Sequence, residues 1–252
     1  MKGLYRFADL EVSIDSVYDE VHLMSQEYAV DSPKSSETSN PIQIRTSETD
    51  IAAESRFSDE ERAFEGLPPC TFPSPYLETL AVYRKMATVM PSYGVMLLHG
   101  SVIAVDGEAY MFTAASGTGK STHVRLWREM FGDRSIMVND DKPLIQVRNE
   151  ERAIVYGTPW DGKHHLSTNI GVPLKAICIL ERGEKNEIRQ ISTEEAYTTL
   201  LQQSFRPSEP LALVNVMQLL NELTSKVRLY RLRCNMNTEA AVVAYEGMNK
   251  DK

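Results

Sequence analysis

Residues 114 to 122 read Ala-Ala-Ser-Gly-Thr-Gly-Lys-Ser-Thr, and they decide the fold that we predict. They follow the phosphate-binding pattern G-x-x-x-x-G-K-[ST], except that Ala114 replaces the first glycine. Glycines in such a loop let backbone N–H groups turn toward phosphate oxygens. Lys120 can then reach the β- and γ-phosphates, and the Ser121 hydroxyl can bind Mg²⁺. The predicted nucleotide-binding residues are Ser116, Gly117, Thr118, Gly119, Lys120, Ser121 and Thr122.

The segments on either side of this loop fit the motif. Residues 108–114 are rich in apolar and aromatic side chains, which predicts a strand that ends at the loop. Val124, Trp127 and Phe131 are spaced by three and four, which predicts a helix over residues 121–131. The positive end of that helix would face the phosphates. Glycine-rich runs of this kind also occur by chance in surface loops, but the strand and helix favour a phosphate site.

Two adjacent carboxylates, Asp140 and Asp141, follow a short apolar run at residues 135–139. They begin 20 residues after Lys120, which fits one helix, a turn and a parallel strand beside the strand at 108–114. One carboxylate can hold Mg²⁺, and the other can act as a base. Paired aspartates at a strand end usually form a turn or a helix cap, but behind a phosphate loop we favour a functional interpretation.

A histidine precedes the strand that leads into the loop. His99-Gly100-Ser101 is followed by an apolar run, residues 102–105, and then by Asp106-Gly107. This dipeptide predicts a β-hairpin between that run and the strand at 108–114. A lone histidine is more often structural than catalytic, but His99 stands about one hairpin upstream of the loop, close enough to lie near the phosphates.

These three features together resemble a known family. His99-Gly100, the loop at 116–121 and Asp140-Asp141 are similar to the nucleotide site of the HPr serine kinase/phosphatase catalytic domain. The loop also resembles that of the related ATP-dependent phosphoenolpyruvate carboxykinase. The nearer resemblance is to a group of HPr-kinase-like proteins with a Gly-Thr-Pro-Trp segment after the paired aspartates, as at residues 157–160 here. The resemblance implies an α/β fold with a P-loop core of this type, in which helices flank a mixed β-sheet.

The resemblance also implies roles for individual residues. Lys120 and the backbone of residues 116–121 would hold the phosphates of ATP or GTP. Ser121 and one aspartate would hold Mg²⁺, while the other aspartate, oriented by His99, would be the base. We prefer Asp140 as the base, which leaves Asp141 as the metal ligand. The catalytic set is thus His99, Lys120, Asp140 and Asp141, and the acceptor is a hydroxyl of a protein, a peptide or a small metabolite. HPr-kinase relatives assemble as oligomers, which implies a homo-oligomer.

The sequence departs from the family in ways that keep other functions open. Thr122 stands where HPr kinases usually carry glutamate, and their long glycine-containing signature segment has no counterpart here. HPr itself is therefore not the expected substrate. Phosphoenolpyruvate-carboxykinase-like activity is kept as an alternative function. With Ala114, Thr122 favours an alternative, a nucleotide-binding accessory module without turnover. A nucleotide-free interaction domain is the remaining alternative, although packing alone does not require Lys120, Ser121 and the two aspartates together.

Composition sets wider bounds. The 252 residues include 42% hydrophobic and 25% charged residues, as in ordinary globular proteins. The N-terminus has no apolar signal core, and no apolar run is long enough for a transmembrane helix. Three widely spaced cysteines, Cys70, Cys178 and Cys234, predict a reduced, cytoplasmic protein. Residues 1–70 carry a net charge of −9 and the remainder +1, which argues against nucleic-acid and membrane partners.

The chain divides into an acidic N-terminal α+β region, residues 1–90, and a P-loop core, residues 91–252. In the first region we predict one strand over residues 4–14, a loop over 31–41, a strand over 42–46, a helical turn over 58–64 and a helix over 76–90. Residues 16–28 fit either a helix or a strand, and the region either folds alone or adds strands to the core.

In the second region, residues 157–165 (Gly-Thr-Pro-Trp-Asp-Gly-Lys-His-His) resemble a functional loop, with Lys163 or a histidine as a candidate contact for substrate or nucleotide. Residues 174–180 form a near-continuous apolar run, which predicts a buried central strand. Arg182 and Arg189 are candidates for charge stabilisation, although a surface role is the expected one. Further helices are predicted from residue 193, over 211–223 and over 238–248, and a strand over 227–234.

Overall fold

The computed structural model describes residues 1–30, 40–64, 66, 68–148, 151–162 and 164–250. They form two compact units, Met1–Ala87 and Thr88–Lys252, which we describe separately. The predicted loop at 31–41 lies mostly outside the described residues, as does Lys163. Among the described residues, no helix is both long enough and apolar enough to cross a bilayer.

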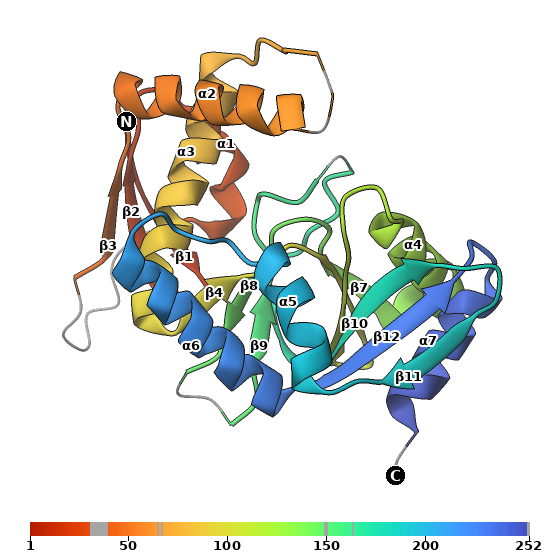
Figure 1. The fold of residues 1–252 in the computed structure, drawn as a ribbon. Coiled ribbons are helices and arrows are strands. Elements are labelled where there is room, and N and C mark those ends of the chain that lie inside the picture. The colour runs from red at the N-terminus through yellow and green to blue at the C-terminus, as the bar shows by residue number, and fades with distance from the viewer. Residues whose placement is uncertain (31–39, 65, 67, 149–150, 163, 251–252) are drawn as a thin grey trace. The chain divides into compact units, whose positions relative to one another are not determined.

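The first unit has a sheet of its own (Figure 1). Strands β1 (Lys2–Phe7) and β2 (Leu10–Asp15) are antiparallel, and β3 (Ile42–Arg45) pairs parallel to β2. The prediction of one strand over residues 4–14 is wrong, because Ala8 and Asp9 adopt positive φ angles of 48° and 61° and turn the chain into a hairpin. Neither residue belongs to the Asn-Gly or Asp-Gly pairs that signal this turn.

The helices of the first unit are α1 (Glu20–Met24), the 3₁₀ helix η1 (Gln26–Tyr28), α2 (Glu48–Phe64) and α3 (Ser74–Val89), which ends just beyond the unit. Helix α2 is much longer than the predicted turn at 58–64. The Glu78 carboxylate on α3 is buried and accepts hydrogen bonds from the backbone N–H groups of Val17 and Tyr18 and from the Thr46 hydroxyl. These bonds pin the helix to the ends of β2 and β3.

The second unit contains a mixed sheet flanked by helices, as predicted (Figure 1). In its described part, the strand order is β4-β8-β9-β10-β6-β5-β7, and β12 pairs with both β10 and β11. The strands are β4 (Val95–Leu97), β5 (Ser101–Val105), β6 (Glu108–Thr113), β7 (Ser135–Asn139), β8 (Leu144–Gln146), β9 (Ile154–Tyr156), β10 (Gly171–Arg182), β11 (Glu187–Gln190) and β12 (Arg228–Cys234). The long β10 runs parallel to both β6 and β12 and antiparallel to β9.

One predicted neighbour is wrong. Strand β7 does not lie beside β6, because β5 lies between them and is antiparallel to both. The predicted hairpin explains this arrangement, since Asp106 and Gly107, with φ angles of 51° and 82°, fold β5 onto one edge of β6. The other edge of β6 pairs with β10. Because β5 is antiparallel to both neighbours, β7 and β6 still run in the same direction and end at the same side of the sheet.

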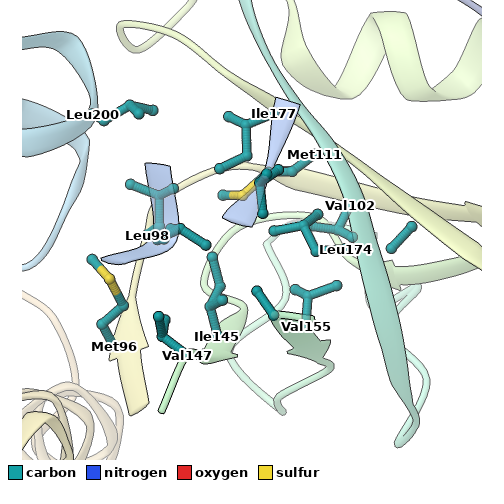
Figure 2. Packing of buried hydrophobic residues seen from close by; sticks show 14 of the residues in the cluster. Met96, Leu98, Val102, Met111, Ile145, Val147, Val155, Leu174, Ile177 and Leu200 are labelled. Carbon is teal, nitrogen blue, oxygen red and sulfur yellow. The ribbon is translucent and has the colours of Figure 1, made fainter. Parts of the chain in front are cut away.

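Helices cover both faces of this sheet. On one face, β5, β6 and β10 pack against α5 (Thr193–Gln203) and α6 (Pro210–Lys226) through a cluster that includes Val102, Met111, Ile177 and Leu200 (Figure 2). On the other face, alternate residues of the same strands pack against α4 (Lys120–Phe131) and α7 (Glu239–Asn249). The 3₁₀ helices η2 (Met90–Tyr93) and η3 (Gly132–Arg134) lead into β4 and β7. Both faces of the sheet are therefore buried, which fixes the ends of β6, β7 and β10 around the glycine-rich loop at residues 116–119.

Candidate functional site

The glycine-rich loop joins the end of β6 to the start of α4, the predicted strand–loop–helix order. Gly117 and Gly119 have φ angles of 73° and 121°, which residues with a Cβ rarely adopt. A Cβ at either position would meet nothing within 4 Å. These glycines are therefore needed for the path of the backbone and leave open space beside it. The first helical bond follows at once, since the His123 N–H donates to the Gly119 carbonyl at 2.9 Å.

Ala114 fits this loop without strain. It is not among the described non-glycine residues with a positive φ, and its side chain is buried in the cluster beneath α4 with Phe112 and Val124. A glycine is thus not required at this position. The departure from the usual motif is a packing feature and does not by itself argue against phosphate binding.

Lys120 begins α4 and folds back over the loop. Its ammonium group donates to the Ala114 carbonyl at 3.0 Å. Burial lowers its pKa, and the charges of Asp141 and Asp140 oppose that shift. The lysine is therefore within electrostatic reach of both aspartates, which ties the loop to the end of β7.

The paired aspartates are held by a residue that we did not single out from the sequence. Asn139, at the end of β7, is fully buried. Its side-chain oxygen accepts the backbone N–H groups of Asp141 at 2.9 Å and Lys142 at 2.7 Å. Its amide nitrogen donates to the carbonyl and the hydroxyl of Thr158 at 3.0 and 3.1 Å. The sequence did offer a signal for this role. Asparagine side chains commonly accept a hydrogen bond from the backbone N–H two residues later in the chain, as Asn139 does from Asp141.

Asp140 lines a cavity beside the first turns of α4. It is 8% exposed and accepts a hydrogen bond from the Ser101 hydroxyl at 2.6 Å. The cavity has a volume of about 290 Å³. Its lining residues are Ser121, Val124, Arg125, Arg128, Met137, Asp140, His164 and Leu166. The structure thus brings the loop serine and the first aspartate to one cavity.

Asp141 has different partners. His99 Nε2 lies 3.0 Å from one of its carboxylate oxygens, and the Lys142 ammonium binds the other. Burial would raise the pKa of Asp141, but the hydrogen bonds and charges of His99 and Lys142 outweigh it and lower the pKa to about 2. The His99 backbone is fixed in turn, since its carbonyl accepts the Thr113 hydroxyl at 2.8 Å. We expected His99 to orient the base, with Asp140 preferred, and that pairing is wrong: His99 contacts Asp141, whereas Ser101 contacts Asp140.

The segment at residues 157–162 packs directly against the aspartates. A Cβ at Gly157 would lie 2.1 Å from the Thr168 carbonyl oxygen and 2.6 Å from that of Val138, so only glycine fits there. Gly162 has a φ of 76°, and a Cβ there would lie 3.5 Å from the Asp141 Cβ. The Gly162 backbone therefore lies close to Asp141, which places the predicted functional loop at the candidate site.

The side chains of this loop divide between structure and cavity. Trp160 and Asp161 are buried, and the Asp161 carboxylate accepts the Ser167 N–H and hydroxyl at 3.1 and 2.9 Å. His165 contacts Asp161 at 3.0 Å, while His164 lines the cavity. Among the described residues, no group of three or more His, Cys, Asp or Glu side chains is placed to hold a metal ion.

A second cavity, of about 580 Å³, opens on the other side of the loop. It is lined by Gly117, Thr118, Gly119, Thr122, His123, Leu126, Leu180, Glu181, Arg182, Gly183, Cys234, Asn235 and Met236. The Arg182 guanidinium donates to the Gly117 carbonyl and, at 3.5 Å, to that of Thr118. Arg182 thus contacts the glycine-rich loop itself, beyond the surface role expected from the sequence.

Comparison with known proteins gives a family and distant structural likenesses. The family model described as "SynChlorMet cassette protein ScmC" matches residues 76–246. Among solved structures, the Hpr(Ser) kinase/phosphatase from Coxiella burnetii is similar at 14% sequence identity, over 50% of this chain and 88% of that chain, with a TM-score of 0.25. This is a weak structural resemblance. No curated protein sequence matches the chain. Because the family model spans more than half of its length, the chain belongs to the family of SynChlorMet cassette protein ScmC.

Proposed function

We propose that this protein is a Mg²⁺- and ATP- or GTP-dependent phosphotransferase with an HPr-kinase-like P-loop core, acting on a hydroxyl of a protein, a peptide or a small metabolite. One observation carries the proposal. Ser121, in the first turn of the helix after the glycine-rich loop, lines the same cavity as Asp140. A phosphate loop, a metal-binding hydroxyl and a carboxylate at one cavity are the parts that phosphoryl transfer needs.

The phosphates would lie over residues 116–121, with Thr122 beside them. Two open backbone positions, Gly117 and Gly119, and the N-terminus of the twelve-residue helix α4 favour an anion here. The Lys120 ammonium, which donates to the Ala114 carbonyl, would turn to the β- and γ-phosphates. A phosphate would thereby add a direct ionic partner for this half-buried ammonium, beyond the charges of Asp141 and Asp140 that already act on it.

Ser121 and Asp141 would hold Mg²⁺. Magnesium prefers oxygen ligands and is usually bound by one or two carboxylates together with substrate phosphates. A hydroxyl and a carboxylate that stays ionised at neutral pH, as the pKa of about 2 for Asp141 ensures, fit that donor set. When bound, the metal would neutralise charge on the β- and γ-phosphates. His99 and Lys142 would keep the Asp141 carboxylate oriented and deprotonated.

Asp140 would be the base. Its carboxylate lines the cavity and is oriented by the Ser101 hydroxyl, so an acceptor in the cavity could bring its own hydroxyl to it. The acceptor oxygen would bond to the γ-phosphorus as the bond from that phosphorus to the β,γ-bridging oxygen breaks. The proton would pass to Asp140, and the nucleoside diphosphate would leave. Positioning and electrostatics supply most of the catalysis in such reactions.

The alternative is a nucleotide-binding module without turnover. Ala114 no longer favours it, because this residue packs without strain, whereas Thr122 in place of glutamate still does. Transfer of labelled phosphate from γ-labelled ATP to any acceptor, lost in Asp140→Asn, would exclude this alternative.

The first test is a thermal melt with ATP and GTP, each with and without Mg²⁺, on the wild type and Lys120→Ala. A nucleotide at about 100 times its dissociation constant should add roughly 2.7 kcal/mol. For a unit of this size that is a shift on the order of 5–10 °C. The shift should require Mg²⁺ and Lys120. Absence of any shift in the wild type would refute the proposal.

The same melt, combined with the labelled-phosphate assay, separates the two aspartates. In the melt, Asp141→Asn should abolish the effect of Mg²⁺, while Asp140→Asn should still be stabilised by Mg²⁺-nucleotide. In the transfer assay, Asp140→Asn should fail to transfer phosphate. The reverse pattern would exchange their roles.

A further inference from the structure

The two cavities at the phosphate loop lie on nearly opposite faces of α4. The helical residues of the larger cavity are Thr122, His123 and Leu126, and those of the smaller cavity are Ser121, Val124, Arg125 and Arg128. At 3.6 residues per turn, the centres of these two sets are about 160° apart around the helix axis. The smaller cavity contains the carboxylate proposed as base, so the larger one is free for another part of the substrate.

The larger cavity is mainly apolar, and several of its polar side chains already have partners. Leu126, Leu180, Cys234 and Met236 contribute apolar surface. Asn235 donates to the Glu184 carbonyl at 2.8 Å and accepts the Asn237 N–H at 3.0 Å. The Glu181 carboxylate is paired with Arg231, and Arg182 is bound to the loop carbonyls. The cavity therefore offers a ligand mainly apolar contact surface, together with the Thr118 and Thr122 hydroxyls that also line it.

His123 adds a flat, uncharged ring to this lining. Its Nε2 accepts the Trp127 N–H at 3.1 Å, so the ring proton is on Nδ1. Nδ1 is buried and has no hydrogen-bond partner among the described residues. Burial lowers the pKa of His123 to about 4, and its ring contacts Phe112 edge-on at 4.5 Å between centroids. At neutral pH the ring is therefore a neutral part of the wall.

The geometry points to the larger cavity as the site of the nucleotide base, held chiefly by apolar contact. This inference rests on the proposed function, because it assumes that the phosphates lie on residues 116–121. Three observations carry it: the cavity is continuous with Gly117–Gly119, its 580 Å³ is within the range of small-molecule pockets, and its wall is mainly apolar. A base in a mainly apolar pocket is bound chiefly by contact area.

Isothermal titration of the full-length protein with Mg²⁺ and tripolyphosphate, ATP or GTP tests this inference. ATP and GTP should each bind at least tenfold more tightly than tripolyphosphate. Met236→Ala should weaken both nucleotides about threefold to tenfold and leave tripolyphosphate unchanged. Met236 is 76% exposed, so this variant should fold. The matched control is Met130→Ala, an exposed methionine of α4 that lines neither cavity.

Alkylation of Cys234 locates the base independently. In a Cys70→Ser background, Cys234 is the partly exposed thiol and Cys178 is buried. Burial raises the pKa of Cys234, so iodoacetamide labelling is best followed at pH 8.5 by mass spectrometry of the peptide. ATP and GTP should protect Cys234 from labelling, and tripolyphosphate should not.

The outcomes separate the two proposals. Tripolyphosphate binding as tightly as ATP, with Cys234 still reactive, would overturn the base site and leave the phosphate site intact. Failure of tripolyphosphate and both nucleotides to bind would overturn the proposed function and this inference with it.

Discussion

Asn139 offers the sharpest test of how the paired aspartates are held, because one buried side chain makes four hydrogen bonds there. Two link its oxygen to the N–H groups of Asp141 and Lys142, and two link its amide to Thr158. Each bond contributes about 1 kcal/mol net to stability. Asn139→Ala should therefore lower the free energy of unfolding by about 3–5 kcal/mol, a large fraction of the 5–15 kcal/mol typical of a domain. It should also abolish the Mg²⁺-dependent stabilisation by nucleotide, since the aspartates lose their anchor.

Urea denaturation followed by tryptophan fluorescence measures this cost. Both tryptophans of the chain, Trp127 and Trp160, lie within Thr88–Lys252, so the signal reports on that unit. Asn215→Ala is the control, because this asparagine makes one long bond of 3.4 Å at the surface, and its loss should change stability by less than about 0.5 kcal/mol.

Thr158→Val completes the test. The Thr158 hydroxyl accepts from Asn139 and donates to the Lys142 carbonyl, so the two substitutions should be non-additive by about 0.5–3 kcal/mol. A loss below about 1 kcal/mol in Asn139→Ala, or strict additivity with Thr158→Val, would refute the view that this network positions the aspartates.

Three further predictions concern pH and packing. Because the Asp141 pKa is lowered to about 2, its ionised carboxylate adds roughly 2 kcal/mol to the free energy of unfolding above pH 4. This contribution is lost as the pH falls toward 2. Urea melts of Asp141→Asn should therefore lose less stability over this pH range than those of the wild type. The His123 pKa is lowered to about 4, so stability should fall by up to about 3 kcal/mol between pH 6.5 and 4, and His123→Phe should flatten that slope. Gly157→Ala should cost more than about 2 kcal/mol in the same melts, because its Cβ would lie 2.1 Å from the Thr168 oxygen; an unchanged midpoint would contradict the packing described.

Local patterns in the sequence predicted the elements around the loop well. The Asp106-Gly107 turn, the spacing of Val124, Trp127 and Phe131, and the apolar run at 174–180 each have one short-range physical cause, and each forms the expected hairpin, helix or strand. The hairpin at Ala8–Asp9 escaped prediction because its residues adopt left-handed backbone angles that their types rarely favour.

Pairing across the sheet was harder to predict. The spacing between Lys120 and Asp140 fits two positions for β7: directly beside β6, or separated from β6 by β5. In both positions β7 ends at the same side of the sheet as β6. Likewise, His99 could orient either aspartate, and only the fold shows that it contacts Asp141 while Ser101 contacts Asp140. Partners of buried polar groups such as Asn139 depend on long-range contacts that a local pattern does not encode.

The division of α4 into two lining faces has an evolutionary consequence. Under the proposed function, Arg125 and Arg128 face the side where an acceptor would bind, and Thr122 and Leu126 face the side assigned to the base. Substitutions on the first face can alter which acceptor is recognised while the second face, and with it the affinity for the phosphate donor, stays unchanged. One helix would then let relatives diversify their substrates without rebuilding the shared donor site.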